Sequence, residues 1–320
     1  MSKQKIIAEK LNNDILEQQV EQDAEREALQ KDAYTPEQVQ AEIDELAAIP
    51  NPKRQRIWEV DFVRGLMILF VVWDHFMWDV NMIGAPSYNT GLFSWLYNLS
   101  EKYYAGALRN VTHDTFVTMF VLTSGVSCSF SRSNIVRALK MCAFALSFTL
   151  ITDVLSSMLG VQLTIYFNVI HVVALSVLIY SLIELLWSLC KKNWLKNLFG
   201  VIFFALTMTA LVVGHCAKYM NVNWTDVIFG QSEWRTELLD KFRYNSGDYL
   251  SFLPDFGWFL VGVVLGKALY RERKSIFPSV NPKFVSPVTF CGRFSLWVYF
   301  ISQVVMYGLI YLLHVILNIL

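Results

Sequence analysis

The sequence predicts an all-α integral membrane protein, a polytopic bundle of about seven helical spans preceded by an amphipathic helical arm in the cytosol. Three observations predict this fold class. Hydrophobic residues make up 54% and aromatic residues 15% of the chain, with a positive mean hydropathy, which exceeds what one soluble 320-residue fold normally carries. Seven apolar stretches are long enough to cross a bilayer, and clusters of basic residues flank them on one side.

The arm is predicted at 1–56, where Glu, Gln, Asp and Lys are frequent and the apolar run of a signal peptide does not occur. A helix start follows Thr35, an N-cap residue, with Pro36 at the first helical position and Gln38 placed to close a capping box. One face of this helix carries an apolar stripe: Val39, Ile43 and Leu46. We therefore expect a solvated amphipathic arm, and a transmembrane domain at 57–320.

Seven spans are predicted in this domain, because a helix that crosses the hydrocarbon layer needs about 20 mostly apolar residues. They are expected at 57–80, 111–130, 136–158, 165–189, 197–216, 249–270 and 294–317. Basic clusters alternate with them and all fall on one side: Lys53, Arg54 and Arg56; Arg132, Arg137 and Lys140; Lys191, Lys192 and Lys196; Arg271, Arg273, Lys274 and Lys283. Since basic loops remain in the cytosol, the amino terminus is expected inside and the carboxyl terminus outside.

The first span is unusually rich in ionisable residues, with Asp61, Arg64, Asp74, His75 and Asp79. Each charge at mid-span costs about 2.5–3.5 kcal/mol on insertion scales, so this number indicates a function. Arg64 and His75 are about three helical turns apart, which places them on one face of the helix, separated by about 16 Å along its axis. Asp61 is positioned to pair with Arg64.

Histidines gather at the outer level of the predicted bundle. We expect His75, His113 and His171 to line a wet pocket below the outer surface, where a neutral imidazole acts as general base and a carboxylate orients it. Taken singly, each of them also fits a satisfied histidine at the membrane interface. His215 and His314 lie at span ends, where that interpretation is favoured.

Charge and cysteine content exclude two other classes of function. The formal net charge is zero, which argues against a nucleic-acid partner, because phosphate binding needs an excess of basic residues on one face. The five cysteines show no paired spacing, so neither a disulfide framework nor a metal site is expected.

Four segments together resemble one protein family. They are the run from Val60 to Leu66 with Asp74, His75, Phe76 and Asp79; the run from Phe120 to Ser127 with Arg132; the run from Tyr166 to His171; and the run from Gly292 to Leu296 with Tyr299. Their order and spacing resemble the heparan-alpha-glucosaminide N-acetyltransferase catalytic family, over most of 57–310. The chain departs from that pattern at Asn168, where relatives often carry Gly, and at Ser302, where many carry His.

The resemblance implies a membrane acetyltransferase that uses cytosolic acetyl-coenzyme A and acts on a sugar amine or hydroxyl on the far side of the membrane. Donor binding is expected for Arg64, Ser124, Gly125, Arg132, Asn168 and Arg293. Catalytic roles are expected for His75, Asp114, His113 and His171. In this interpretation His75 deprotonates the acceptor or accepts the acetyl group itself, with Asp114 or Asp74 orienting an imidazole; alternatively His113 or His171 is the base.

The resemblance also implies an extracytoplasmic glycan acceptor, a homodimer and a bacterial plasma membrane as the location. Aromatic residues in the loops at 81–109 and 217–250 are suited to stacking on sugar rings, although an aromatic belt at the membrane interface explains them more simply. Two alternatives are a secondary transporter and a membrane scaffold. A transporter usually has internal repeats, which the sequence does not show, and a scaffold leaves Arg64 and His75 unexplained.

Overall fold

The structure is a computed structural model that describes residues 57–83, 91–160, 163–244, 248–278, 280 and 283–319. The chain divides into two units, Met1–Gln55 and Arg56–Leu320, and the fold described below is that of the second unit. The predicted cytosolic arm lies outside the described residues.

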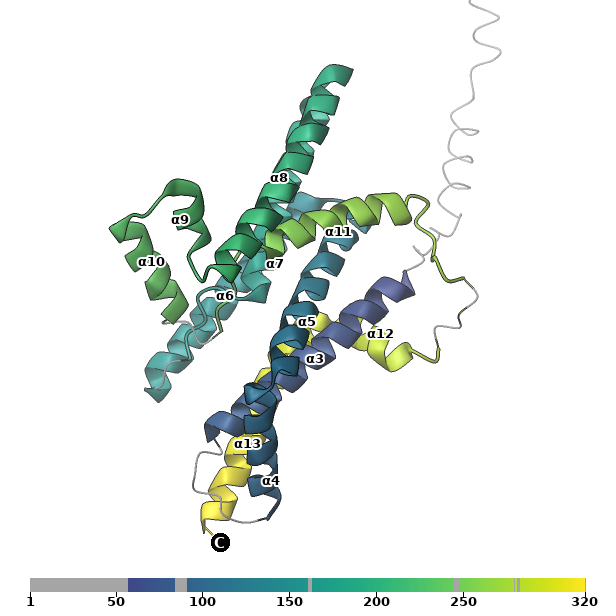
Figure 1. The fold of residues 1–320 in the computed structure, drawn as a ribbon. Helices are drawn as coiled ribbons and strands as arrows, with labels where there is room; N and C mark the ends of the chain where they lie inside the picture. Colours follow the sequence, from purple (N-terminus) through teal and green to yellow (C-terminus); the bar gives the residue numbers. More distant parts are fainter. Residues whose placement is uncertain are drawn as a thin grey trace, which may run out of the picture. The chain divides into compact units, whose positions relative to one another are not determined.

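Helices make up most of this described part (Figure 1). In chain order they are α3 (Trp58–Ile83), α4 (Gly91–Ala105), α5 (Ala107–Val126), the 3-10 helix η1 (Ser127–Phe130), α6 (Asn134–Leu159), α7 (Val169–Leu189), α8 (Asn193–Tyr219), α9 (Trp224–Phe229), α10 (Glu233–Tyr244), α11 (Asp255–Leu269), α12 (Ser286–Arg293) and α13 (Ser295–Ile319). The all-α prediction is therefore confirmed.

Seven of these helices, α3, α5, α6, α7, α8, α11 and α13, cover the seven predicted spans. Within the described residues, α6, α7, α8 and α13 are long and apolar enough to cross a membrane. For α3, α5 and α11 a membrane span remains a prediction. Each of the three has a physical reason to differ: α3 carries acidic and basic side chains, α5 is rich in polar residues, and α11 has 15 residues, about 22 Å against a hydrocarbon layer of about 30 Å.

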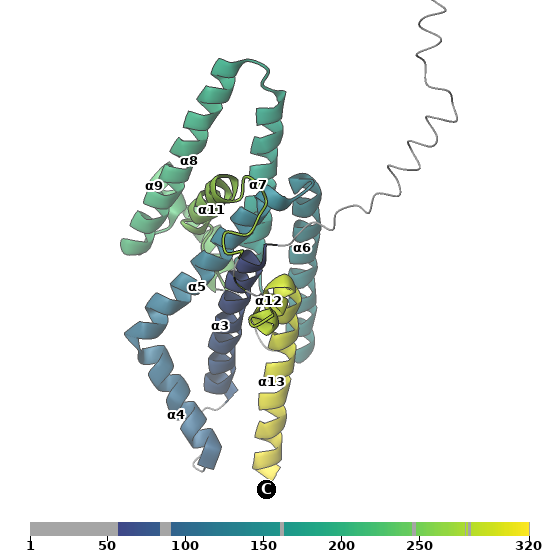
Figure 2. The ribbon, with the colours of Figure 1, turned by 90° about the vertical axis from the view of Figure 1, so that its right-hand side faces the viewer.

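The helix α3 lies at the centre of one group, packed against α5, α12 and α13. Figures 1 and 2 show α12 crossing the first turns of α3, and α13 running beside the rest of it. Two glycines allow the crossing: a Cβ atom on Gly65 would lie 1.9 Å from the carbonyl oxygen of Val288, and one on Gly292 would lie 1.7 Å from that of Asp61. The backbones of α3 and α12 are therefore in direct contact.

A second close crossing joins α5 to α11. A Cβ atom on Gly125 would lie 2.1 Å from the carbonyl oxygen of Phe259, and one on Gly262 would lie 2.0 Å from that of Leu122. Small residues are common where membrane helices pack closely. The largest apolar cluster surrounds this crossing and includes Val121, together with side chains from α7.

A smaller apolar cluster joins α3, α6, α7 and α13. Its buried members include Ile68, Phe148, Ala174 and Tyr299. Large apolar side chains on the outer faces of α6, α8 and α13 are exposed, as expected for helices that face lipid.

Candidate functional site

A cavity of about 520 Å³ lies between α5, α6, α7 and the start of α13, and we call it the basic cavity. Its cationic lining residues are Arg64, Arg132, Arg137 and Lys140, and its apolar ones include Phe120, Met141, Ile170, Val173 and Leu296. Three of the six predicted donor-site residues line it: Arg64, Ser124 and Arg132. This combination suits a ligand that has anionic phosphates and a less polar arm.

The side chain of Arg64 is held against α5 and retains an unused donor. Its Nη2 atom donates to the carbonyl oxygen of Thr123 (3.2 Å) and to Oγ of Ser127 (2.6 Å). Its Nε atom is buried and has no hydrogen-bond partner among the described residues. Because an unpaired buried donor costs free energy, an anion in the basic cavity would be a suitable acceptor for Arg64.

Ser124 and Gly125, which are adjacent and were both predicted to bind the donor, have different surroundings. Ser124 lines the basic cavity, and its carbonyl oxygen accepts a hydrogen bond from Nη2 of Arg137 (3.3 Å). Gly125 instead faces the backbone of α11 at Phe259, so its lack of a side chain is explained by helix packing. Of these two predicted donor-site residues, Ser124 therefore lies at the cavity and Gly125 at the crossing of α5 with α11.

The other two predicted donor-site residues, Asn168 and Arg293, do not line the basic cavity. Asn168 is fully buried as the N-cap of α7, where its side chain accepts a hydrogen bond from the backbone N–H of Ile170 (3.1 Å). Arg293 is exposed in the last turn of α12. The structure therefore gives Asn168 a part in shaping the start of α7, away from the cations of the cavity.

His75 lies further along α3, and its imidazole is partly exposed. Its ring meets the ring of Tyr299 edge to face, with centroids 5.6 Å apart and an interplanar angle of 75°. Within the described part of the chain, no hydrogen bond holds either nitrogen of His75. We call this end of α3 the histidine end. An imidazole with unoccupied nitrogens is suited to exchange a proton with a bound substrate.

One packed apolar layer separates the basic cavity from His75. Phe120, Ile170 and Leu296 line the cavity and also belong to the apolar cluster that contains Tyr299, the ring partner of His75. A ligand arm that reaches from the cavity to the imidazole must therefore pass between these side chains.

Both ring nitrogens of His171 are engaged. Nε2 lies 2.9 Å from Oγ1 of Thr149, and Nδ1 lies 2.9 Å from Oδ1 of Asn168. With Asn168, this histidine forms a capping box at the start of α7. Because its nitrogens already have partners in the fold, His171 is less suited than His75 to act as the base.

Two groups beside these histidines were not predicted as site residues from the sequence. The buried hydroxyl of Tyr299 donates to Oδ2 of Asp248 (3.1 Å) and accepts from Nδ2 of Asn168 (3.3 Å). Tyr299 entered the sequence argument only through the family resemblance. Asp248 is the acidic residue just before the sixth predicted span, which is the one signal that could have found it.

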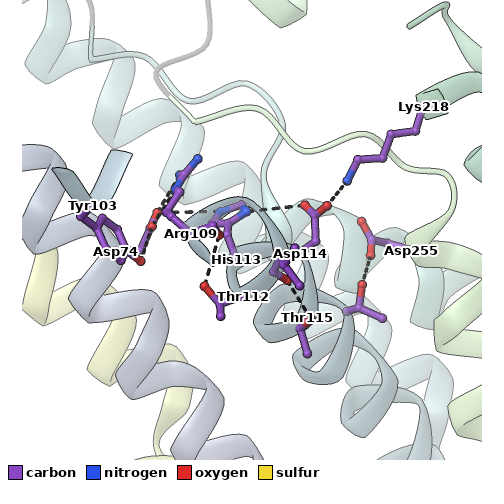
Figure 3. Close-up of polar contacts among 11 residues, drawn as sticks. Asp74, Tyr103, Arg109, Thr112, His113, Asp114, Thr115, Lys218 and Asp255 are labelled. Carbon is purple, nitrogen blue, oxygen red and sulfur yellow. Dashed lines mark hydrogen bonds and ion pairs between the residues drawn. The ribbon is translucent and has the colours of Figure 1, made fainter. Parts of the chain in front are cut away.

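His113 lies between two carboxylates at the histidine end (Figure 3). Its Nε2 atom is 3.9 Å from Oδ2 of Asp74, and its Nδ1 atom is 3.8 Å from Oδ1 of Asp114. Asp114 also forms an ion pair with Lys218. The described contacts of Asp114 are therefore with His113 and Lys218, and they include none with His75.

Asp74 has a partner that sequence reasoning missed. Nε and Nη2 of Arg109 each donate to one of its carboxylate oxygens, both at 3.0 Å, and the hydroxyl of Tyr103 donates to it as well (Figure 3). The hydrogen bond to Asp74 raises the pKa of Arg109 above its ordinary value. Burial, together with the charge of Asp74, raises the pKa of Tyr103. The only signal in the sequence was a single basic residue just before the second predicted span.

In the part of the chain that the structure describes, no group of three or more His, Cys, Asp or Glu residues is placed to hold a metal ion. The described groups are imidazoles, carboxylates paired with basic side chains, and guanidinium groups, a set suited to proton transfer and to the binding of anions.

Comparison with known proteins gives one match. A sequence model of a protein family, described as heparan-alpha-glucosaminide N-acetyltransferase, catalytic, matches residues 56–304, which is more than half of the chain. No curated protein and no solved structure matches. The match includes the residues of the basic cavity, His75 and Tyr299.

Proposed function

The chain belongs to the heparan-alpha-glucosaminide N-acetyltransferase catalytic family, and from this premise we propose that it transfers an acetyl group across the membrane. The donor is cytosolic acetyl-coenzyme A, and the acceptor is an amino sugar or a sugar hydroxyl on the extracytoplasmic side. Four apolar helices and the family together make the chain an integral membrane protein. One observation carries the proposal: α3 holds Arg64, which lines the basic cavity, and, about 16 Å further along, His75, whose imidazole has no hydrogen bond to a described residue.

The basic cavity is proposed as the donor site. Arg64, Arg132, Arg137 and Lys140 would neutralise the phosphates of coenzyme A, because guanidinium groups match phosphate geometry. The apolar lining would accept the thioester arm, which then extends between Phe120 and Leu296 toward His75. Transfer through a narrow apolar layer also keeps water from the thioester.

His75 is proposed as the general base. Its imidazole removes a proton from the amine or hydroxyl of the acceptor, whose nitrogen or oxygen attacks the carbonyl carbon of the thioester. The carbon–sulfur bond breaks, and the departing thiolate of coenzyme A takes the proton from the imidazolium. His75 is favoured over His171, because both ring nitrogens of His171 already contact Thr149 and Asn168. It is favoured over His113 because each ring nitrogen of His113 faces a carboxylate, which leaves neither nitrogen open to the acceptor.

The acceptor is proposed to bind at the histidine end. The helix α4 contributes Trp95 and Tyr97 beside the predicted second span, and Trp95 is well exposed. Aromatic faces of this kind stack on sugar rings.

The substitution His75→Ala tests the proposal. Purified protein in detergent would be supplied with labelled acetyl-coenzyme A and glucosamine, and acetylated sugar measured. We expect His75→Ala to lower kcat by about 100-fold or more, because general base catalysis contributes about that factor, and to leave donor binding unchanged. The matched control is His215→Ala, an exposed histidine on α8 that accepts a hydrogen bond from Trp258.

The control variant should retain the wild-type turnover. Near-normal turnover by His75→Ala would exclude His75 as the base, and loss of activity in His171→Ala alone would transfer that role to His171. No transfer by the wild-type protein to any amino sugar or sugar hydroxyl would contradict the proposed function itself.

A further inference from the structure

The hydroxyl of Tyr299 joins three distant segments of the chain. Tyr299 lies on α13 with 2% of its surface exposed. Its oxygen donates to Oδ2 of Asp248, which precedes α11, and accepts from Nδ2 of Asn168 at the start of α7. A buried phenol that both donates and accepts, with one partner a carboxylate, has its ring orientation fixed by these bonds.

The ring of Tyr299 is also the described contact that limits the rotation of His75. The two rings meet edge to face at a centroid separation of 5.6 Å. Since no hydrogen bond to a described residue orients His75, the position of its imidazole depends on packing. Tyr299 also packs against Phe148 of α6, with ring centroids 6.2 Å apart.

Asp248 is itself anchored beside the start of α7. The backbone N–H of Leu250 donates to the carbonyl oxygen of Phe167 (3.2 Å), and the rings of Tyr249 and Phe167 lie 6.5 Å apart. The segment around Asp248 is therefore attached to the segment that carries Asn168. The two residues that bind the Tyr299 hydroxyl, Asp248 and Asn168, therefore lie on segments that contact each other.

We propose that Tyr299 is a positioning residue for His75, and that Asp248 and Asn168 hold its hydroxyl for this purpose. The inference rests on the proposed function, since it assigns His75 the role of base. It adds that the geometry of the base is set from α13 and from the segment before α11. Removing the hydroxyl keeps the aromatic ring but releases it from its two partners, so the ring shifts and the imidazole packed against it loses its defined orientation.

The test compares Tyr299→Phe with a matched control, Tyr180→Phe. Both tyrosines are 2% exposed, and both donate a hydrogen bond to a carboxylate, which for Tyr180 is Glu184 at 3.2 Å. Tyr180 has no described contact with His75. We expect Tyr299→Phe to lower kcat by about 10- to 100-fold, as misplacement by about 1 Å does, with KM for acetyl-coenzyme A unchanged within about twofold. Tyr180→Phe should keep the wild-type kcat.

A loss of stability alone would lower the amount of folded protein in both variants, so thermal melting of each is measured in detergent. Similar melting temperatures combined with a fall in kcat for Tyr299→Phe alone support the positioning role. Equal losses of kcat in the two variants would overturn it, because the effect would then follow from any lost buried hydroxyl.

A double-mutant cycle with Asp248→Asn tests whether the carboxylate acts through Tyr299. If it does, Asp248→Asn lowers kcat in the wild-type background and has no further effect in Tyr299→Phe. If the fold-losses of kcat caused by the two single substitutions multiply in the double variant, the assignment of Asp248 would be overturned. Wild-type kcat in Tyr299→Phe, from a wild-type enzyme that is active, would overturn the proposal while leaving the proposed function intact; an inactive wild-type enzyme would contradict the latter instead.

Discussion

Arg109 and Asp74 form the most strongly bonded pair at the histidine end, because two parallel hydrogen bonds join a guanidinium to a carboxylate. The guanidinium also lies over the ring of Tyr104, 4.7 Å from its centroid. This pair fixes the start of α5, which carries His113, against α3, which carries His75. This bidentate contact therefore adds to the packing that places the two histidine-bearing helices side by side.

The substitution Arg109→Lys should destabilise the protein by about 1–2 kcal/mol, because lysine keeps the charge but loses the bidentate geometry and the stacking on Tyr104. Thermal melting in detergent measures it, with Arg271→Lys, an exposed arginine, as the control. The hydrogen bond to Asp74 raises the pKa of Arg109. The ion pair therefore keeps its contribution to the stability of the fold until the pH rises through the pKa of Arg109. The effect should therefore be equal at about pH 6 and about pH 9. An unchanged melting temperature would contradict the assigned strength of this pair.

Single residues were predictable where a charge or a histidine lies inside an apolar stretch. Arg64 and His75 stand out in this way, and the structure places Arg64 at the basic cavity and His75 against Tyr299. Arg109 and Asp248 were missed because both lie at the borders of predicted spans, where charged residues are common. Their roles depend on contacts with α3 and α13, which no local pattern encodes.

At the scale of helices, the crossing of α3 and α12 depends on two glycines that face each other's backbone. The substitution Gly65→Ala places a methyl group 1.9 Å from the carbonyl oxygen of Val288, a distance that only movement of a helix can relieve. We expect a loss of about 3 kcal/mol or more, at or above the upper end of the usual cost of overpacking. The measurement is the yield and the melting temperature of the folded protein.

The matched control for this prediction is Gly200→Ala in the interior of α8, where an added Cβ atom would meet nothing within 4 Å. That variant should be as stable as the wild type or gain up to about 1 kcal/mol, because alanine favours helix more than glycine does. Equal stability of Gly65→Ala and Gly200→Ala would show that α3 and α12 do not touch as described.

The long helices could be predicted from the sequence, and the short ones could not. Apolar stretches placed seven helices near the expected positions, and four of them are long and apolar enough to cross a membrane, where a helix satisfies its own backbone. The helices α4, α9, α10 and α12 lie in segments interpreted as loops, since their sequences mix polar and aromatic residues without a long apolar run. The N-cap of α7 at Asn168 was also unforeseen, because its partner His171 was assigned to chemistry.

At the scale of the whole molecule, α3 links the two halves of the proposed reaction. Its first turns contact α12 and place Arg64 at the basic cavity, and its later turns place His75 beside α13. The apolar layer between them separates a cationic region from a region rich in carboxylates and imidazoles. This separation is what a transfer from a cytosolic donor to an outer acceptor requires.

The most direct test of this account uses proteoliposomes in which the protein has one orientation. A membrane-impermeant thiol reagent reads the orientation at Cys190, in a variant with no other cysteine, since Cys190 adjoins the basic residues Lys191 and Lys192. Labelled acetyl-coenzyme A is placed on the side of Cys190 and glucosamine on the opposite side. We predict acetylated sugar on the glucosamine side in this arrangement, and none when the two substrates are exchanged. Product that forms only when both substrates are on the same side would contradict transfer across the membrane.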